Sequence, residues 1–292
     1  MRHARVYGIA GLAVLAIAAV AFAQTTVTPL PDNAPVQTAP IDATAVSALA
    51  KARPGDAKAG ATKAGTCAAC HGLDGNGTDP ALYPRLAGQS ERYVAHQLAL
   101  FKSGERVNAI MQPYAAPLTA QDMRDLGAYF ATQKSGAGVA DDTVIASGSN
   151  AGMKFYAVGE TLFRSGDAAR GIPACMACHG PAGAGNPGPA YPRLSGQMAD
   201  YSERRLIEYR EGIHNRKDAA LFNVMHEVAQ NLTDVEIQSL STYLQGLHDR
   251  ADDAAATGAA PAAAPAAAAA SAPAPASPAA PEPAAEPAPR QS

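Results

Sequence analysis

The clearest periodic pattern in this sequence of 292 residues is a pair of segments whose apolar residues recur at helical spacing. They are LTAQDMRDLGAYF at 118–130 and LTDVEIQSLSTYL at 232–244. The apolar faces consist of Met123, Leu126, Tyr129 and Phe130 in the first segment and Ile237, Leu240, Tyr243 and Leu244 in the second. Each segment opens with a threonine followed three residues later by an acid, which is typical of a capped helix start. We therefore expect two matching helices.

These helices belong to a longer internal duplication. CAACHG at 67–72 aligns with CMACHG at 175–180, an offset of 108, and YPRLAGQ at 83–89 aligns with YPRLSGQ at 191–197 at the same offset. The matching helices align at an offset of 114, so the second copy has six extra residues within 210–224. Self-similarity of this kind defines the units of a fold. The chain is therefore expected to contain two domains.

Each copy is predicted to contain about three helices joined by long loops, and no strand pattern is present. The expected helices of the first copy run from near Asp56 into the cysteine motif, from about Ser90 to Ser103 before Gly104, and onward from Thr119. Those of the second copy run from near Met153 into the motif, from about Ala199 to Glu211 before Gly212, and onward from Thr233. Glycine commonly ends a helix. Loops this long need something to pack on, and a large apolar cofactor would serve.

The segments outside the two copies have a different composition. A charged start, an apolar run and the box Ala21-Phe22-Ala23 predict a secretory signal peptide cut before Gln24. The expected order is a signal peptide at 1–23, a Pro/Ala-rich flexible lead-in at 24–54, a first domain at 55–134, a linker at 135–151, a second domain at 152–250 and an Ala/Pro-rich disordered tail at 251–292. The alternative is an uncut N-terminal anchor, which would tether the protein to a membrane, and weak membrane association is otherwise the most that we expect.

The net charge of the chain argues against one class of partner. The formal charge is −3, from 23 basic and 26 acidic residues, and removal of Arg2 and Arg5 with the leader leaves 21 against 26, or −5. This mild acidity without a basic stripe argues against nucleic-acid binding.

The chemistry of the chain is concentrated in the two C-x-x-C-H motifs. The residues concerned are Cys67, Cys70 and His71 in the first copy and Cys175, Cys178 and His179 in the second. A zinc site would need a second ligand pair in each domain, and a thioredoxin-type dithiol belongs in a strand–helix–strand context. The same spacing is the attachment signature of c-type haem, in which both thiols bond to the porphyrin and the histidine binds iron. We therefore predict two covalently bound haem c groups.

The internal alignment also selects a sixth iron ligand. Met111 and Met225 each lie eight residues before the threonine of the third helix, in what are expected to be loops. Met123 aligns with Ile237 on an apolar helical face and is therefore expected to be core. The prediction is that Met111 and Met225 bind the two irons, which fills both axial positions and leaves one-electron exchange as the expected chemistry.

Histidine ligation at the sixth position is the alternative. His96 aligns with Arg204, and His226 aligns with Gln112. Neither histidine is repeated, so this alternative requires the two domains to differ.

At this point the sequence resembles a known family. Two tandem units, each with C-x-x-C-H-G, a YPRL(A/S)GQ stretch and a methionine before an L-T helix, look like cytochrome c4 over about 55–247. The resemblance implies an all-α fold of two tandem cytochrome c-like domains. Each would have about three helices and long loops around a covalent haem, and the two haems would face each other across a pseudo-twofold interface.

The same resemblance implies a periplasmic electron carrier of the respiratory chain, without catalytic residues. Its redox partners would be a quinol-oxidising cytochrome bc complex as donor and a terminal oxidase as acceptor. One alternative is a cytochrome subunit of a periplasmic dehydrogenase, and another, from a different class, is a dihaem peroxidase. A peroxidase needs an open or displaceable axial ligand, which the matched methionines argue against.

Other repeated residues have less specific assignments. A metal-bound histidine usually donates its second ring N–H to an acceptor, and we expect the carbonyls of Pro84 and Pro192 to accept it. Arg85 and Arg193 either pair with haem propionates or are solvated loop residues, and Tyr93 and Tyr201 either line the haem pocket or fill the core.

Overall fold

The computed structural model describes residues 42–214 and 219–248. The expected signal peptide at 1–23, the lead-in as far as residue 41, and the tail at 251–292 lie outside the described residues.

The described residues form helices joined by turns and irregular loops. In the first half these are α1 (Ala45–Ala48), the 3₁₀ turn η1 (Leu49–Lys51), α2 (Ala57–Lys63), α3 (Gly65–His71), α4 (Glu91–Lys102), α5 (Met111–Ala115) and α6 (Ala120–Ala131). In the second half they are α7 (Phe155–Ser165), η2 (Ala168–Arg170), α8 (Met176–His179), α9 (Ala199–Arg210), α10 (Ala220–Ala229) and α11 (Asp234–Gly246).

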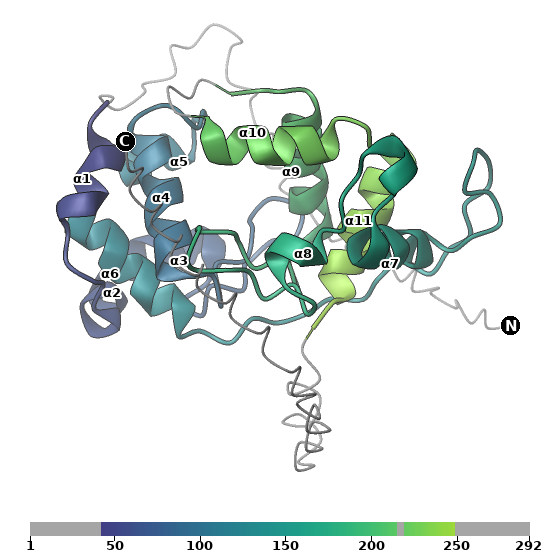
Figure 1. The fold of residues 1–292 in the computed structure, drawn as a ribbon. Coiled ribbons are helices and arrows are strands. Elements are labelled where there is room, and N and C mark those ends of the chain that lie inside the picture. The colour runs from purple at the N-terminus through teal and green to yellow at the C-terminus, as the bar shows by residue number, and fades with distance from the viewer. Residues whose placement is uncertain (1–41, 215–218, 249–292) are drawn as a thin grey trace, which may run out of the picture.

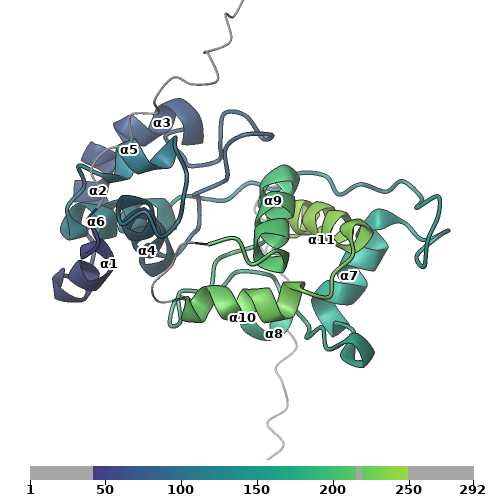
Figure 2. The same ribbon diagram turned by 90° about the horizontal axis from the view of Figure 1, so that it is seen from above.

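The helices gather into two side-by-side bodies. Figure 1 and Figure 2 place α1 to α6 in one body and α7 to α11 in the other, joined by the segment between α6 and α7. Within residues 42–214 and 219–248, β-type backbone pairing is limited to three isolated bridges, such as the one between Asp167 and Ile172. The all-α, two-domain expectation is confirmed. No helix of these residues is long and apolar enough to span a bilayer.

The ends of the longest helices follow local sequence signals. Thr119 and Asp122 form a capping box at the start of α6, and Thr233 and Glu236 form the matching one at α11. Gly104, just after α4, has a φ of +72°. The predicted starts and stops of these helices are therefore confirmed.

Each body contains a close helix crossing at an equivalent position. In the first body α6 packs against α2 and α4, and in the second α11 packs against α7 and α9. A Cβ atom on Gly60 of α2 would lie 2.0 Å from the carbonyl oxygen of Asp125 in α6, and one on Gly159 of α7 would lie 2.1 Å from that of Ser239 in α11. The two crossings are equivalent and require glycine, because the backbones approach too closely for any side chain.

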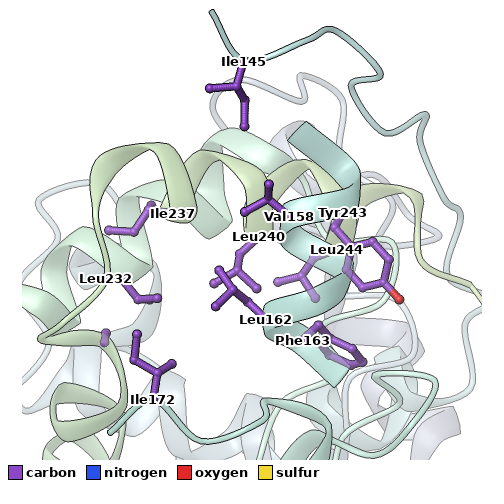
Figure 3. Close-up of a cluster of buried hydrophobic side chains, with 11 residues drawn as sticks. Ile145, Val158, Leu162, Phe163, Ile172, Leu232, Ile237, Leu240, Tyr243 and Leu244 are labelled. Atoms are coloured by element: carbon purple, nitrogen blue, oxygen red, sulfur yellow. The ribbon is translucent and has the colours of Figure 1, made fainter. Parts of the chain in front are cut away.

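The core of the second body lies beside its crossing. Figure 3 shows Val158, Leu162 and Phe163 of α7 gathered with Leu240 and Leu244 of α11. Phe163 is fully buried. The helical apolar spacing predicted for 232–244 therefore marks a true core face.

The expectation that the first helix of each copy runs into the cysteine motif is wrong, because the motif lies in a separate short helix. In the second copy α7 ends at Ser165, and the cysteine motif lies in the separate short helix α8. Gly166 follows the end of α7 with a φ of +64°, and a Cβ there would lie 2.3 Å from the carbonyl oxygen of Ile172, so the turn before the motif requires glycine. In the first copy α2 and α3 follow each other directly, with Ala64 between them.

The methionine segments are helical, not loops. Met111 is the first residue of α5, and Met225 lies inside α10. Pro113 does not prevent α5, because proline is tolerated in a first helical turn. Phe222 and Ala229 of α10 are buried, and α10 packs against α9. Packing on α9 thus stabilises a helix where loop structure was expected.

Candidate haem sites

The first domain contains a cavity of about 810 Å³. Its wall includes Cys67, Cys70 and His71 from α3 and Met111 from α5, four residues that the sequence analysis assigned to one site. Much of the remaining wall is apolar and includes Leu98, Leu118, Leu126 and Phe130. The fold therefore joins the motif and its proposed methionine around one apolar space.

His71 is held in a defined orientation. It is the last residue of α3 and only 6% exposed, and its Nδ1 lies 2.9 Å from the carbonyl oxygen of Pro84. Burial lowers the pKa of His71, and the hydrogen bond to Pro84 opposes that shift only in part. A neutral ring that donates from Nδ1 carries its lone pair on Nε2, which is the form that binds metals.

His179 repeats this geometry in the second domain. It is 5% exposed, and its Nδ1 lies 2.9 Å from the carbonyl oxygen of Pro192. Burial likewise lowers the pKa of His179. The expectation that Pro84 and Pro192 supply the acceptor carbonyls is confirmed in both domains.

A tyrosine lies beside each of these histidines. The ring centres of Tyr83 and His71 are 6.1 Å apart, and those of Tyr191 and His179 are 5.9 Å apart. Each tyrosine directly precedes the proline just described, so the YPRL stretch of each domain supplies two neighbours to the histidine of that domain.

The first cysteine of each motif lies in an environment that disfavours the thiolate. Burial raises the pKa of Cys67, and it raises the pKa of Cys175 to about 11. A thioredoxin-type dithiol instead needs a lowered pKa. Residues 42–214 and 219–248 contain no cluster of three or more His, Cys, Asp or Glu side chains that could hold a metal ion.

The two methionines differ in what surrounds them. The N–H of Met111 donates to Asn108 Oδ1 at 2.8 Å, which ties the start of α5 to the preceding loop at the cavity wall. Met225 is half-buried in α10, just after residues 215–218, which lie outside the described part of the chain. Its neighbour His226 has Nδ1 2.7 Å from the carbonyl oxygen of Tyr209. Met225 as an iron ligand stays a prediction.

The two bodies meet next to the first cavity. Tyr93 lines this cavity together with Tyr201, Arg205 and Glu208, which come from α9 of the other domain. Arg106 of the first domain donates to the hydroxyl of Tyr201 at 3.1 Å. Tyr93 and Tyr201 are thus pocket residues, and only the arrangement of the two domains places both at the same cavity.

The arginines of the YPRL stretches lie at the domain interface. The Nη1 of Arg85 donates to the carbonyl oxygen of Gly136 at 3.2 Å and also to that of Gly196. The backbone N–H of Arg85 donates to Oε1 of Gln197, and the backbone N–H of Arg193 donates to Oε1 of Gln89. Sequence reasoning missed these two glutamines, although their repetition in LAGQ and LSGQ was a usable signal.

The residues present fit a covalent haem. The cavity has a size usual for ligand sites and an apolar wall, with two thiols and a neutral histidine at the spacing of haem attachment. The Nε of Arg85 is buried at the cavity wall without a hydrogen-bond partner among the described residues, and a carboxylate would satisfy it.

Comparisons with known proteins agree with this chemistry. The cytochrome c family model matches residues 57–134 and 156–248. Cytochrome c4 of Pseudomonas aeruginosa is 41% identical over 182 residues, which is 62% of this chain and 84% of that protein. A thiosulfate dehydrogenase electron acceptor from Thiomonas intermedia is 39% identical over 182 residues, 61% of this chain and 77% of that protein.

A solved structure shows the same similarity in three dimensions. The crystal structure of reduced recombinant cytochrome c4 from Pseudomonas stutzeri superposes with a TM-score of 0.58 at 40% identity, covering 66% of this chain and all of that one. Together these matches confirm two cytochrome c domains and the resemblance noted in the sequence. The chain belongs to the cytochrome c4 family, as a two-domain electron carrier with a covalently bound haem c in each domain.

Proposed function

We propose that this protein carries single electrons in the periplasm from a quinol-oxidising cytochrome bc complex to a terminal oxidase. The observation that carries the proposal is the cavity in which Met111 lies with Cys67, Cys70 and His71. If His71 and Met111 both bind the haem iron, no position would be left for oxygen or peroxide, which favours electron exchange over bond chemistry.

The proposed site residues have three roles. Cys67, Cys70, Cys175 and Cys178 attach the two haems, His71 and His179 are the proximal ligands, and Met111 and Met225 are the sixth ligands. Haem c, when bound, supplies a one-electron iron couple.

The chain's own residues prepare each site for that chemistry. The carbonyls of Pro84 and Pro192 hold Nδ1–H of each histidine, so that Nε2 is left to bind metal. In the first domain, Leu98, Leu126 and Phe130 help to exclude water from the cavity. A thioether ligand favours ferrous iron and thereby raises the reduction potential.

The balance of charge supports brief docking to redox partners. Residues 56–135 contain 8 basic and 7 acidic residues, and residues 152–250 contain 10 basic and 11 acidic residues. Neither domain is strongly charged, so we expect weak, transient complexes whose rates depend only modestly on salt.

The proposed route is tested with membranes. The purified, reduced protein is mixed with membranes from its own organism, and haem oxidation is followed with and without cyanide. Fast, cyanide-sensitive oxidation is expected. Absence of oxidation, combined with rapid reduction by a co-purifying dehydrogenase, would contradict the oxidase-donor route.

A second candidate is electron acceptor to a periplasmic dehydrogenase. The specific observation in its favour is the relative from Thiomonas intermedia, whose name is thiosulfate dehydrogenase electron acceptor. Reduction of the oxidised protein by a thiosulfate dehydrogenase and thiosulfate would support this candidate. The similar proteins above are cytochromes and an electron acceptor, which favours a carrier over a dihaem peroxidase.

We further propose that residues 1–23 are a signal peptide that directs the chain to the periplasm, with cleavage before Gln24. The proposed haem domains are 55–134 and 152–250, joined by the linker at 135–151 and flanked by the lead-in at 24–54 and the tail at 251–292. The two ranges matched by the family model support the domain assignment.

A further inference from the structure

The peptide group between Pro84 and Arg85 makes one hydrogen bond within its own domain and one to the other domain. Its carbonyl oxygen lies 2.9 Å from Nδ1 of His71, in the same domain. Its N–H, on Arg85, donates to Oε1 of Gln197 at 2.8 Å, and Gln197 belongs to the other domain. One peptide unit therefore connects the first proximal histidine to a side chain of the second domain.

The second domain contains the mirror arrangement. The peptide between Pro192 and Arg193 has its carbonyl oxygen 2.9 Å from Nδ1 of His179 and its N–H 3.0 Å from Oε1 of Gln89. Gln89 and Gln197 are equivalent at the repeat offset of 108. The interface thus contains two chains of hydrogen bonds that cross, each running from a glutamine of one domain to the histidine of the other.

Each glutamine is fixed at both ends of its amide. Nε2 of Gln197 donates to the carbonyl oxygen of Arg85 at 3.0 Å, and Nε2 of Gln89 donates to that of Arg193 at 2.8 Å. Gln197 is 6% exposed and Gln89 is 4% exposed. Both amides are therefore oriented by two bonds to the same residue and are shielded from water, where hydrogen bonds are electrostatically stronger.

We propose that Gln197 and Gln89 are positioning residues that tune the proximal histidine of the opposite domain. The inference rests on the proposed function in one respect, that His71 and His179 are the iron ligands. An acceptor on the peptide N–H polarises the peptide and makes its carbonyl a better acceptor for Nδ1–H. A better acceptor makes the imidazole a stronger donor to the metal, which favours ferric iron.

The sign of the effect follows from this chain of bonds. Without Gln197, the carbonyl of Pro84 should bind His71 less strongly, and the reduction potential of the first haem should rise. Without Gln89, the potential of the second haem should rise in the same way. The reduction potential of each haem therefore depends on the docking of the other domain.

The test uses the holoprotein with Gln197→Met, a side chain of similar length that cannot accept the N–H bond. Two quantities are measured: the separate reduction potentials of the two haems, and hydrogen exchange at the amide of Arg85. We expect faster exchange at Arg85 and a rise confined to the first haem. The oxidised-to-reduced ratio at fixed potential should change about two- to tenfold. Tenfold corresponds to about 59 mV for one electron.

Gln245→Met is the matched control. The Gln245 side chain also joins two backbone groups, accepting from the N–H of Ala199 at 3.1 Å and donating to the carbonyl of Val139 at 2.9 Å. Neither group belongs to a peptide bonded to a proximal histidine. This variant should leave the first haem's potential close to that of the wild type, and an equal rise in Gln245→Met would overturn the inference.

The Gln89 variant distinguishes a specific effect on one haem from general loosening of the interface. Gln89→Met should raise the second haem's potential and not the first. Equal shifts of both haems in either variant would indicate general loosening of the interface and overturn the inference, as would faster exchange at Arg85 without any shift.

A second variant serves if Gln197→Met does not fold. Gln197→Glu keeps an acceptor for the Arg85 N–H and loses the bond from Nε2 to the Arg85 carbonyl, so we expect continued protection of that amide and a first-haem potential that does not rise. A rise would contradict the inference. Failure of the proposed function is seen separately, in the wild type, as a lack of electron exchange with membranes or dehydrogenase.

Discussion

The crossing of α2 and α6 should not tolerate even a methyl group at Gly60. A Cβ at this position would lie 2.0 Å from the backbone oxygen of Asp125, against at least 3.4 Å for an ordinary contact. The helices would have to separate by about 1.4 Å, the difference between these distances. Overpacking of this kind costs about 1–3 kcal/mol, and a backbone atom that cannot rotate away places the cost near the upper limit.

Part of this cost is offset by helix propensity. Alanine is about 1 kcal/mol more favourable than glycine inside a helix. The expected net effect of Gly60→Ala is therefore a loss of about 2 kcal/mol in the free energy of unfolding of the first domain. Chemical denaturation of the holoprotein, followed by circular dichroism and haem absorbance, measures this loss.

Ala61→Gly in the same helix is the internal control. Ala61 is an exposed residue of α2, so its substitution changes helix propensity without changing the crossing. It should cost about 1 kcal/mol. If Gly60→Ala instead stabilises the first domain by a similar amount, the close crossing is not the constraint that the geometry indicates.

Three further predictions concern the cofactor, the mature chain and acid stability. Replacing Met111 or Met225 by alanine should open that iron to carbon monoxide and lower its reduction potential, and ready binding of carbon monoxide by the ferrous wild type would contradict six-coordination. Intact mass spectrometry should find two covalent haems on a chain that begins at Gln24, and a mass with one haem or a retained leader would refute the corresponding part. Burial alone would raise the pKa of Asp122, but hydrogen bonds led by that from Lys63 lower it to about 2, from a usual value near 3.8. The stabilisation of the fold by ionised Asp122 is therefore present above about pH 4 and is lost as pH falls toward 2. Replacing Lys63 by methionine should make the free energy of unfolding depend less on pH in denaturation curves recorded between pH 2 and 6.

Short segments of the sequence were enough to predict the haem attachment motifs and the ends of several helices. The two C-x-x-C-H motifs, the capping boxes at Thr119 and Thr233, and the stop at Gly104 are each readable within a few residues. Repetition added what a single copy could not, because it separated the paired methionines from Met123. It also selected Pro84 and Pro192 as the acceptors for the two histidines. The motifs, the caps and the acceptor carbonyls could be predicted because each depends on chemistry that is close in sequence or is present twice, whereas the two methionines as iron ligands stay predictions.

Only the tertiary structure decided which of these pieces touch. The glutamine of each LAGQ-type stretch contacts an arginine 104 or 112 positions away, in the other domain. The need for glycine at Gly60 and Gly159 comes from helices that cross at long range, and α10 is helical with buried residues that pack it against α9. Hydrophobic periodicity describes one face of one element and carries no information about its neighbour. The haem attachment motifs were therefore legible in the sequence, whereas the hydrogen bonds between the two domains arose from the docking of the domains.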